Sequence, residues 1–199
     1  ANHALFKASL FMVAGIIDHS CGSRDLRHIG NLRPALPVLF IVALVATLSM
    51  AGIPPLGGFI SKELFYESSL HSALPGAWPR LLPLLALLAS VLTVAYCAKF
   101  LVWTFLRPPA EPAAGHGHFH APPAAFAIAP AILAALALAL GPGAQAFTPG
   151  LLEPAALAVA PPALDHHEHL HLALWHGWNL PLLMSLATVL LGAALFAAL

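Results

Sequence analysis

Long apolar runs dominate this sequence, and few charged residues interrupt them. A helix needs about 20 predominantly apolar residues to cross the hydrocarbon core of a bilayer. Because the runs are apolar on every side, without the alternation of a membrane β-barrel strand, the sequence predicts an all-α, polytopic bundle of membrane helices. The expected spans, some of them incomplete, cover residues 3–17, 37–70, 81–106, 124–140 and 179–199.

The composition agrees with a membrane protein. Charged residues make up 8% of the chain and hydrophobic residues 60%, with a mean hydropathy of +0.86. A soluble domain carries about 25% charged residues, so a soluble globule and a disordered chain are both excluded. The formal net charge is +0, which gives no reason to expect a nucleic-acid partner. The expected surroundings are the lipid bilayer of the cell membrane.

The chain divides into three parts. Residues 1–143 hold the first four expected spans, residues 144–178 form a segment rich in proline and histidine that is expected at the membrane interface, and residues 179–199 form a further span. Both ends of the sequence lie inside apolar runs. We therefore expect a piece of a longer protein, with its first and last spans truncated.

The arginine residues of the connections predict an orientation. The loops after the first and third spans hold Arg24, Arg27, Arg33 and Arg107, whereas the loop after the second span holds only Arg80. Short cytoplasmic loops carry an excess of Lys and Arg. The first and third connections are therefore predicted to lie on the cytoplasmic side.

Lys7 lies within the first apolar run, four residues after His3. That spacing places both side chains on one face of a helix. A lysine near the bilayer centre costs at least about 2.5 kcal/mol on insertion scales, so such residues face a protein interior or a hydrated cavity and mark ion routes. Buried lysines and histidines can load and release protons. The alternative is that the Lys7 ammonium reaches the membrane surface.

The second run is interrupted by two adjacent prolines among glycines. Pro54 and Pro55 lack the N–H that a helix requires, and Gly52, Gly57 and Gly58 favour irregular backbone. Irregular backbone at this depth persists only where protein covers it or where it lines a wet cavity. Because broken helices of this kind form ion sites in transporters, we predict one discontinuous membrane helix with a functional break.

Lys62 directly follows this break and is the candidate proton-relay group. Glu63 comes next, and Glu67 lies one turn further on the same face as Glu63, so both are auxiliary candidates. The alternative is a kinked helix that ends at the interface with an ordinary Lys-Glu pair. Lys99 could also assist a relay, but its helical spacing from Trp103 favours an ammonium that reaches the surface beside an aromatic belt.

Two histidine clusters raise the question of a metal site. The alternating histidines of the first cluster are expected in a solvated loop, which supplies neither the fixed geometry nor the supporting hydrogen bonds that a zinc site requires. The second cluster is expected to bind metal only adventitiously, so no dedicated metal site is predicted. A histidine-rich metal transporter stays an alternative. No phosphate loop or dinucleotide fingerprint is present, and no cofactor is predicted. The clusters consist of His116, His118 and His120, and of His166, His167, His169 and His171.

Several segments carry a family resemblance. The sequence reads HALFKA at 3–8, GIIDH at 15–19, RD at 24–25 and SMAGIPPLGGFISKE at 49–63. These segments resemble the antiporter-like membrane subunits that respiratory complex I shares with the Mrp cation/proton antiporters. LWHGWNLP at 174–181 favours the large A-type component of the Mrp antiporters. The resemblance is strong over residues 1–106, weaker over 107–165 and moderate beyond.

The resemblance implies roles for individual residues. It implies that His3 and Lys7 transfer protons along a central axis and that Lys62 stands at the outlet end of the path. It implies a Na⁺/H⁺ antiporter made of several different membrane subunits, with a first-half repeat that this chain lacks. Two loop positions depart from the family, Cys21 where Thr is expected and Asn31 where Gly is common.

A redox-driven pump is the principal alternative to an antiporter. In NADH-quinone oxidoreductase or a membrane-bound hydrogenase, the same residues would move protons, but electron transfer elsewhere would supply the energy. The antiporter is expected to be a secondary transporter rather than an enzyme.

Overall fold

A computed structural model describes residues 2–110, 119–152, 154–155, 158, 174 and 177–199, and the regular elements of these ranges are helical. The first are α1 (Asn2–Cys21), α2 (Pro37–Ala51), α3 (Gly57–Leu70) and α4 (Trp78–Leu101). The π-helical turn η1 (Val102–Leu106) extends α4. The later elements are the 3-10 turn η2 (Ala124–Ala127), α5 (Ile128–Ala139), α6 (Ala144–Phe147), the π-helical turn η3 (Thr148–Leu152) and α8 (Leu180–Ala198).

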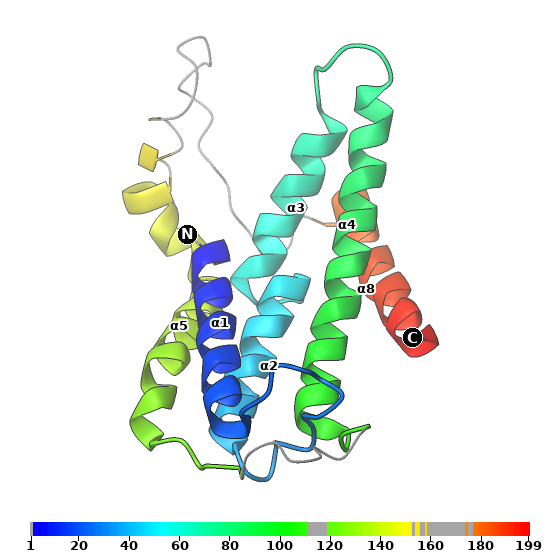
Figure 1. The fold of residues 1–199 in the computed structure, drawn as a ribbon. Coiled ribbons are helices and arrows are strands. Elements are labelled where there is room, and N and C mark those ends of the chain that lie inside the picture. The colour runs from blue at the N-terminus through cyan, green and yellow to red at the C-terminus, as the bar shows by residue number, and fades with distance from the viewer. Residues whose placement is uncertain (1, 111–118, 153, 156–157, 159–173, 175–176) are drawn as a thin grey trace.

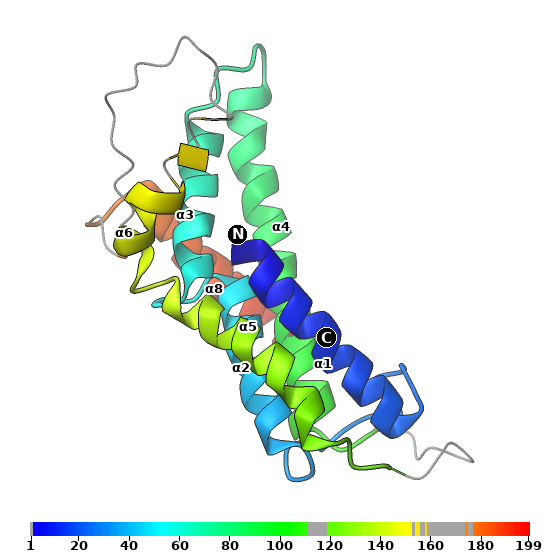
Figure 2. The same cartoon turned by 90° about the vertical axis from the view of Figure 1, so that its left-hand side faces the viewer.

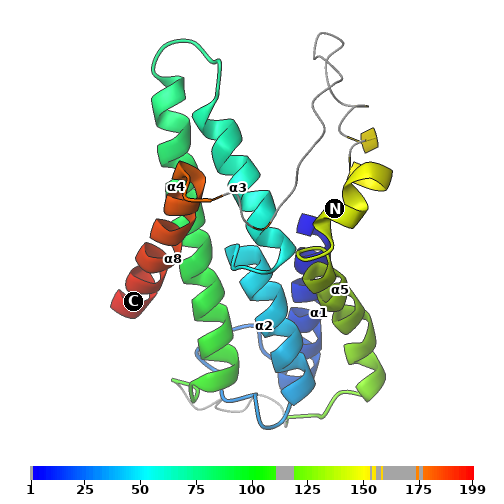
Figure 3. The same cartoon turned by 180° about the vertical axis from the view of Figure 1, so that it is seen from behind.

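The helices α2 and α3 lie end to end and form the central column of the bundle (Figure 1). α4 runs beside both of them, α1 and α5 pack against α2, and α8 packs against α4 and α3. Figures 2 and 3 show α1 and α5 side by side, with α8 across α4 from this pair. The largest apolar core lies between α1, α2, η1 and α5, and it includes Val13, Leu39, Ala43 and Phe105.

In the described part of the chain, three helices are long and apolar enough to cross a membrane, namely Asn2–Cys21, Trp78–Leu106 and Leu180–Ala198. The helix α2 has 15 residues. At 1.5 Å per residue it is about 22 Å long, shorter than a bilayer core of about 30 Å, so α2 needs α3 to complete a crossing. Among the described residues, these elements confirm the predicted all-α membrane bundle with one discontinuous helix.

The break in the second span is formed by residues 52–56. Gly52 ends α2 in the left-handed conformation, with a φ of 72°, and the bond between Pro54 and Pro55 is cis. A Cβ on Gly58, at the start of α3, would overlap the backbone oxygen of Ser49 in α2. Glycine is therefore required where the two half-helices touch.

A second bend follows α5 and was not predicted from the sequence. The segments Ala124–Ala139 and Ala144–Gly150 are together long and apolar enough to cross a membrane, but they meet at 94°. Gly141, at this bend, lies directly against the backbone of the first break. A Cβ on Gly141 would overlap the backbone oxygen of Pro55, so only glycine allows this approach. The end of α5 thus packs onto the irregular backbone of the discontinuous helix and helps to cover it.

The connections after α1 and after η1 lie at the same end of the bundle. The N–H of Asn31 donates to the Arg107 carbonyl at 2.8 Å, and that of Leu32 donates to the Thr104 carbonyl at 3.2 Å. Asn31 has a φ of 52°, a conformation in which Asn is the usual substitute for Gly. The structure agrees that both arginine-bearing loops share one side, and their cytoplasmic location stays a prediction.

An exposed ion pair lies in the loop after α1. Arg27 contacts the carboxylate of Asp25, with its Nη2 at 2.6 Å from Oδ2. These hydrogen bonds hold the pKa of Asp25 well below its usual range. Asp25 therefore stays ionised at any physiological pH.

The boundaries of the predicted spans differ from the helices in detail. α1 continues beyond Ile17 to Cys21, because the polar residues after the apolar run extend the helix into the loop. η1 ends at Leu106, as predicted for the third span, although its last turn is π-helical. α6 and η3 begin the predicted interfacial segment. Most of the remainder, including residues 159–173, lies outside the described residues, so the interfacial placement stays a prediction.

Candidate functional site

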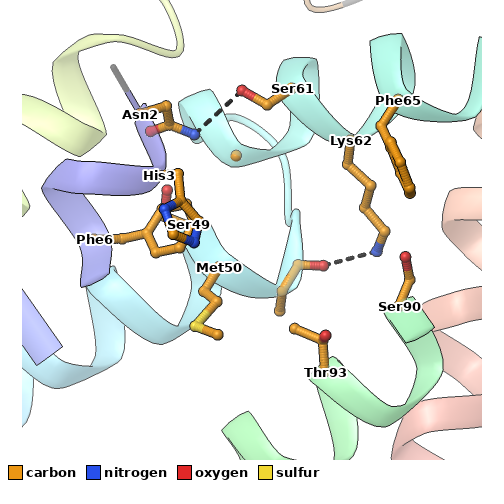
Figure 4. Close-up of a pocket in the computed structure, with 12 residues that line it drawn as sticks. Asn2, His3, Phe6, Ser49, Met50, Ser61, Lys62, Phe65, Ser90 and Thr93 are labelled. Atoms are coloured by element: carbon orange, nitrogen blue, oxygen red, sulfur yellow. Dashed lines mark hydrogen bonds between the residues drawn. The ribbon is translucent and has the colours of Figure 1, made fainter. Parts of the chain in front are cut away.

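A cavity of about 400 Å³ lies where α1, both halves of the discontinuous helix and α4 meet. We call it the Lys62 cavity. His3 from the first turn of α1 and Lys62 from α3 both line it, so the structure brings together two residues that are 59 positions apart (Figure 4). Its lining is Asn2, His3, Phe6, Ser49, Met50, Ala51, Gly58, Ser61, Lys62, Phe65, Ser90 and Thr93.

The amine of Lys62 binds the end of the other half-helix. Its Nζ donates to the carbonyl oxygen of Ala51 at 2.8 Å. Ala51 is the last residue of α2, where carbonyls lack intrahelical partners and the helix dipole is negative. A cation is stabilised at this position, so the break creates the binding place for the ammonium of Lys62.

Gly52 shapes the path of the Lys62 side chain. A Cβ on Gly52 would overlap the Lys62 Cδ, and it would also lie 3.4 Å from Nζ. The aliphatic stem of Lys62 therefore rests directly on the glycine that ends α2. The left-handed backbone and the missing side chain of Gly52 are both needed for the contact between Lys62 and Ala51.

Small polar side chains of the Lys62 cavity were missed by the sequence analysis. The Ser90 hydroxyl of α4 lies beside the amine (Figure 4), and Thr93 lines the same cavity from α4, where its hydroxyl donates to the Ala89 carbonyl at 2.8 Å. Ser49 is fully buried, and its hydroxyl has no hydrogen-bond partner among the described residues. The sequence did contain a signal for two of them, because Ser90 and Thr93 are polar residues at helical spacing within an apolar span. These hydroxyls can hold water, and the cavity has room for several water molecules.

Lys7 lies in a neighbouring cavity of about 200 Å³, between α1, α2 and α4. We call it the Lys7 cavity. Its lining includes Thr47, Met50 and Tyr96, and the Lys7 Nζ lies 5.9 Å from the centre of the Tyr96 ring. Lys7 and His3 share one helix, yet they open into different cavities. Met50 lines both of them.

The auxiliary candidates lie outside these two cavities. Glu63 is buried on α3, with 8% of its surface exposed, while Glu67 is exposed further along the same helix. The Lys99 Nζ lies 4.5 Å from the centre of the Trp103 ring. This cation–π contact agrees with the alternative that Lys99 sits beside an aromatic belt.

The described part of the chain contains no group of three or more His, Cys, Asp and Glu side chains that could hold a metal ion. Of the first histidine cluster, the structure describes only His120. Its backbone N–H donates to the carbonyl of Ser20, near the end of α1. The second cluster, His166 to His171, lies outside the described residues.

Comparisons with known proteins match the part of the chain that builds the Lys62 cavity. Residues 1–93, which hold α1, both half-helices and the first part of α4, match the family described as "NADH:quinone oxidoreductase/Mrp antiporter, TM". The chain is also 42% identical, over 96% of its length, to the A-type subunit of the Na⁺/H⁺ antiporter of Bacillus subtilis. This chain belongs to that family. The resemblance that the sequence motifs indicated is confirmed.

Two further relatives extend the match over nearly the whole chain. The A/B-type subunit of a probable K⁺/H⁺ antiporter of Rhizobium meliloti is 38% identical over 98% of the chain. The solved structure of the Mrp complex from Dietzia sp. DQ12-45-1b superposes with a TM-score of 0.77 at 38% identity and 99% coverage. The chain spans 25% of the B. subtilis relative, 19% of the R. meliloti relative and 20% of the solved chain.

Proposed function

We propose that this chain is the part of a monovalent cation/proton antiporter subunit that carries the outlet end of a proton path, with Lys62 as the group that loads and releases the proton. The observation that carries the proposal is the Lys62 amine, 2.8 Å from the free carbonyl at the end of α2, inside a cavity that His3 also lines. A secondary transporter of the cell membrane, rather than an enzyme, is the corresponding class.

The environment of Lys62 supports proton exchange. The carbonyl of Ala51 and the C-terminal end of α2 stabilise the protonated amine, whereas partial burial of the side chain disfavours it. These opposing effects make the protonation state sensitive to small movements of α3 relative to α2. A short displacement of Lys62 from the Ala51 carbonyl would favour release of its proton into the hydroxyl-lined cavity.

His3 and Lys7 supply the preceding groups of the proposed path. His3 lines the cavity of Lys62, and a histidine can both accept and donate a proton near neutral pH. Lys7 lies one turn along α1, in the adjoining cavity. We infer that protons pass between these groups through ordered water, because no direct contact joins their charged atoms in the described structure.

The names of the relatives favour an antiporter over a redox-driven pump. The family description includes NADH:quinone oxidoreductase, so the fold alone is compatible with either mechanism. The B. subtilis relative is named for Na⁺ and the R. meliloti relative for K⁺, and both belong to antiporters. We infer that further parts of the same polypeptide, together with other membrane subunits, complete the transporter, with protons and a monovalent cation, Na⁺ first, as its substrates.

The substitution Lys62→Ala in the complete antiporter complex tests the proposal. Cation-dependent proton movement is measured in everted membrane vesicles with Na⁺ and with K⁺, and assembly is measured by co-purification of the subunits. We expect Lys62→Ala to abolish exchange while the complex still assembles, because the cavity loses its proton-carrying group.

Lys99→Ala is the matched control. It removes a lysine of a neighbouring helix whose ammonium lies over Trp103 and not in either cavity, so exchange should persist. Full exchange activity in an assembled Lys62→Ala complex would contradict the proposal. NADH-dependent quinone reduction that co-purifies with the parent protein would favour the redox pump instead.

A further inference from the structure

The two cavities share a wall formed by Met50. This residue stands in the last turn of α2, one residue before the carbonyl that binds Lys62, and its side chain lines both the Lys62 cavity and the Lys7 cavity. Figure 4 shows the Met50 side chain extending from α2 below His3 and Ser49. Met50 is the lining residue that the two cavities have in common, so its side chain stands between them.

Tyr96 of α4 holds Met50 in place. Its hydroxyl donates to the Met50 Sδ at 3.3 Å. A thioether accepts hydrogen bonds weakly and donates none, so the chain of hydrogen bonds that starts at the Tyr96 hydroxyl ends at the sulfur. The ring of Tyr96 also lies beneath the Lys7 ammonium. Tyr96 thus contacts both Met50, which lies between the cavities, and the ammonium of Lys7.

We propose that Met50 is the barrier that interrupts proton transfer between the Lys7 cavity and the Lys62 cavity, and that Tyr96 keeps it closed. The inference rests on the proposed function of Lys62. Apolar constrictions block conduction because they exclude the water that a proton needs. Methionine is unbranched and flexible, so a change of rotamer can open the barrier without moving a helix.

The barrier prevents uncoupled leakage. If water joined the two cavities permanently, protons would equilibrate between Lys7 and Lys62 whether or not a cation moved. While the Met50 side chain blocks the path, protons pass from one cavity to the other only when the barrier opens. Movement of the end of α2, which carries both Met50 and the carbonyl partner of Lys62, would change the barrier and the hold on the amine together.

Two substitutions of Met50 in the complete complex separate polarity from volume. Everted vesicles are given a pH gradient without added Na⁺ or K⁺, and its rate of collapse is measured. Met50→Gln keeps approximately the length of the side chain but can hydrogen-bond to water, so the passive proton leak should rise severalfold. Met50→Leu keeps an apolar side chain of similar volume, so the leak should stay at the level of the unmodified complex.

Further variants assign the leak to this path. Lys62→Ala added to Met50→Gln should return the leak to the unmodified rate, because the proton then lacks its receiving group. Tyr96→Phe removes a hydroxyl and no packing volume, and a moderate rise in leak is expected. It tests the same claim if Met50→Gln fails to assemble, since Tyr96 is an exposed residue and the loss of its hydroxyl leaves the fold in place.

The outcomes distinguish this inference from the proposed function. Equal leak rates in assembled Met50→Gln, Met50→Leu and unmodified complexes would overturn the barrier, as would an unchanged leak in Tyr96→Phe when Met50→Gln does not assemble. If Lys62→Ala still abolishes exchange in that case, the role of Lys62 stands without the barrier. If Lys62→Ala leaves exchange intact, the proposed function fails first.

Discussion

Gly52 connects the backbone of the break to the chemistry of the site. Its left-handed φ of 72° would be strained for most side-chain-bearing residues, by roughly 1–2 kcal/mol, and its missing Cβ leaves room for the stem of Lys62. A change at Gly52 therefore acts on the position of the amine, although glycine has no titratable group of its own.

We predict that Gly52→Ala lowers cation/proton exchange more strongly than it lowers assembly. The new methyl group displaces Lys62 from the Ala51 carbonyl, so the amine is still present but wrongly placed. Exchange in everted vesicles and the yield of co-purified subunits provide the two measurements.

Gly15→Ala is the control for this change. Gly15 lies in α1, and a Cβ there would meet no atom within 4 Å in the described structure. It should leave both measurements unchanged. Equal exchange rates in the two alanine variants would mean that the stem of Lys62 does not depend on Gly52.

The half-helix α3 is tied to α8 by a buried hydrogen bond. Tyr66 and Thr188 are both fully buried, and their hydroxyl oxygens are 2.6 Å apart. Thr188 donates its hydrogen to the Met184 carbonyl at 2.7 Å, so Tyr66 is the donor between the two hydroxyls. This bond fixes the half-helix that carries Lys62 against a helix that is distant in the sequence.

We predict that Thr188→Val destabilises the complex more than Tyr66→Phe does. The valine leaves the buried Tyr66 hydroxyl without an acceptor, at a cost of about 1–3 kcal/mol, whereas the phenylalanine removes the donor and Thr188 keeps its bond to Met184. The temperature at which the complex, heated in everted vesicles, loses half of its exchange activity measures the difference. The reverse order of stability would mean that this bond does not anchor α3.

The helices and the break could be predicted from the sequence, because both depend on local chemistry. The length of each apolar run predicts a membrane span. Pro54 and Pro55 lack the N–H groups that a helix needs, so they interrupt the helix whatever surrounds them. The bend after α5 could not be predicted, because it depends on the contact between Gly141 and the Pro55 carbonyl, which are distant in the sequence.

The candidate site was predictable only in part, for the same reason. Lys62 and His3 are conspicuous as polar residues near or within apolar runs, and the structure places both in one cavity. Their common cavity and the wall formed by Met50 depend on how α1, α2 and α4 pack. An uncharged methionine in an apolar run carries no signal in the sequence, so its position between the cavities was found only in three dimensions.

The bundle as a unit has two ends with different charge. Arg24, Arg33 and Arg107 lie at the end where the loops after α1 and η1 meet, and the turn between α3 and α4 lies at the other end (Figure 1). By the positive-inside rule, the excess of arginine predicts that the first end lies in the cytoplasm. The Lys62 half of the broken helix then lies toward the opposite side of the membrane.

We predict that cysteines at Ser23 and Ser72 react from opposite sides of the membrane. A membrane-impermeant thiol reagent should label Ser72→Cys in right-side-out vesicles and Ser23→Cys in everted vesicles. Cys21 and Cys97 are replaced by serine in both variants to remove background labelling. Labelling of both positions from the same side would exclude this arrangement.

Lys62→Arg in the complete complex tests the proposed proton relay most directly. Arginine keeps the positive charge and can donate to the Ala51 carbonyl, but it does not release a proton at physiological pH. If Lys62 must load and release a proton, the variant should assemble normally and lose cation/proton exchange with both Na⁺ and K⁺. Exchange at the unmodified rate in an assembled Lys62→Arg complex would show that a fixed charge is sufficient and would contradict the relay.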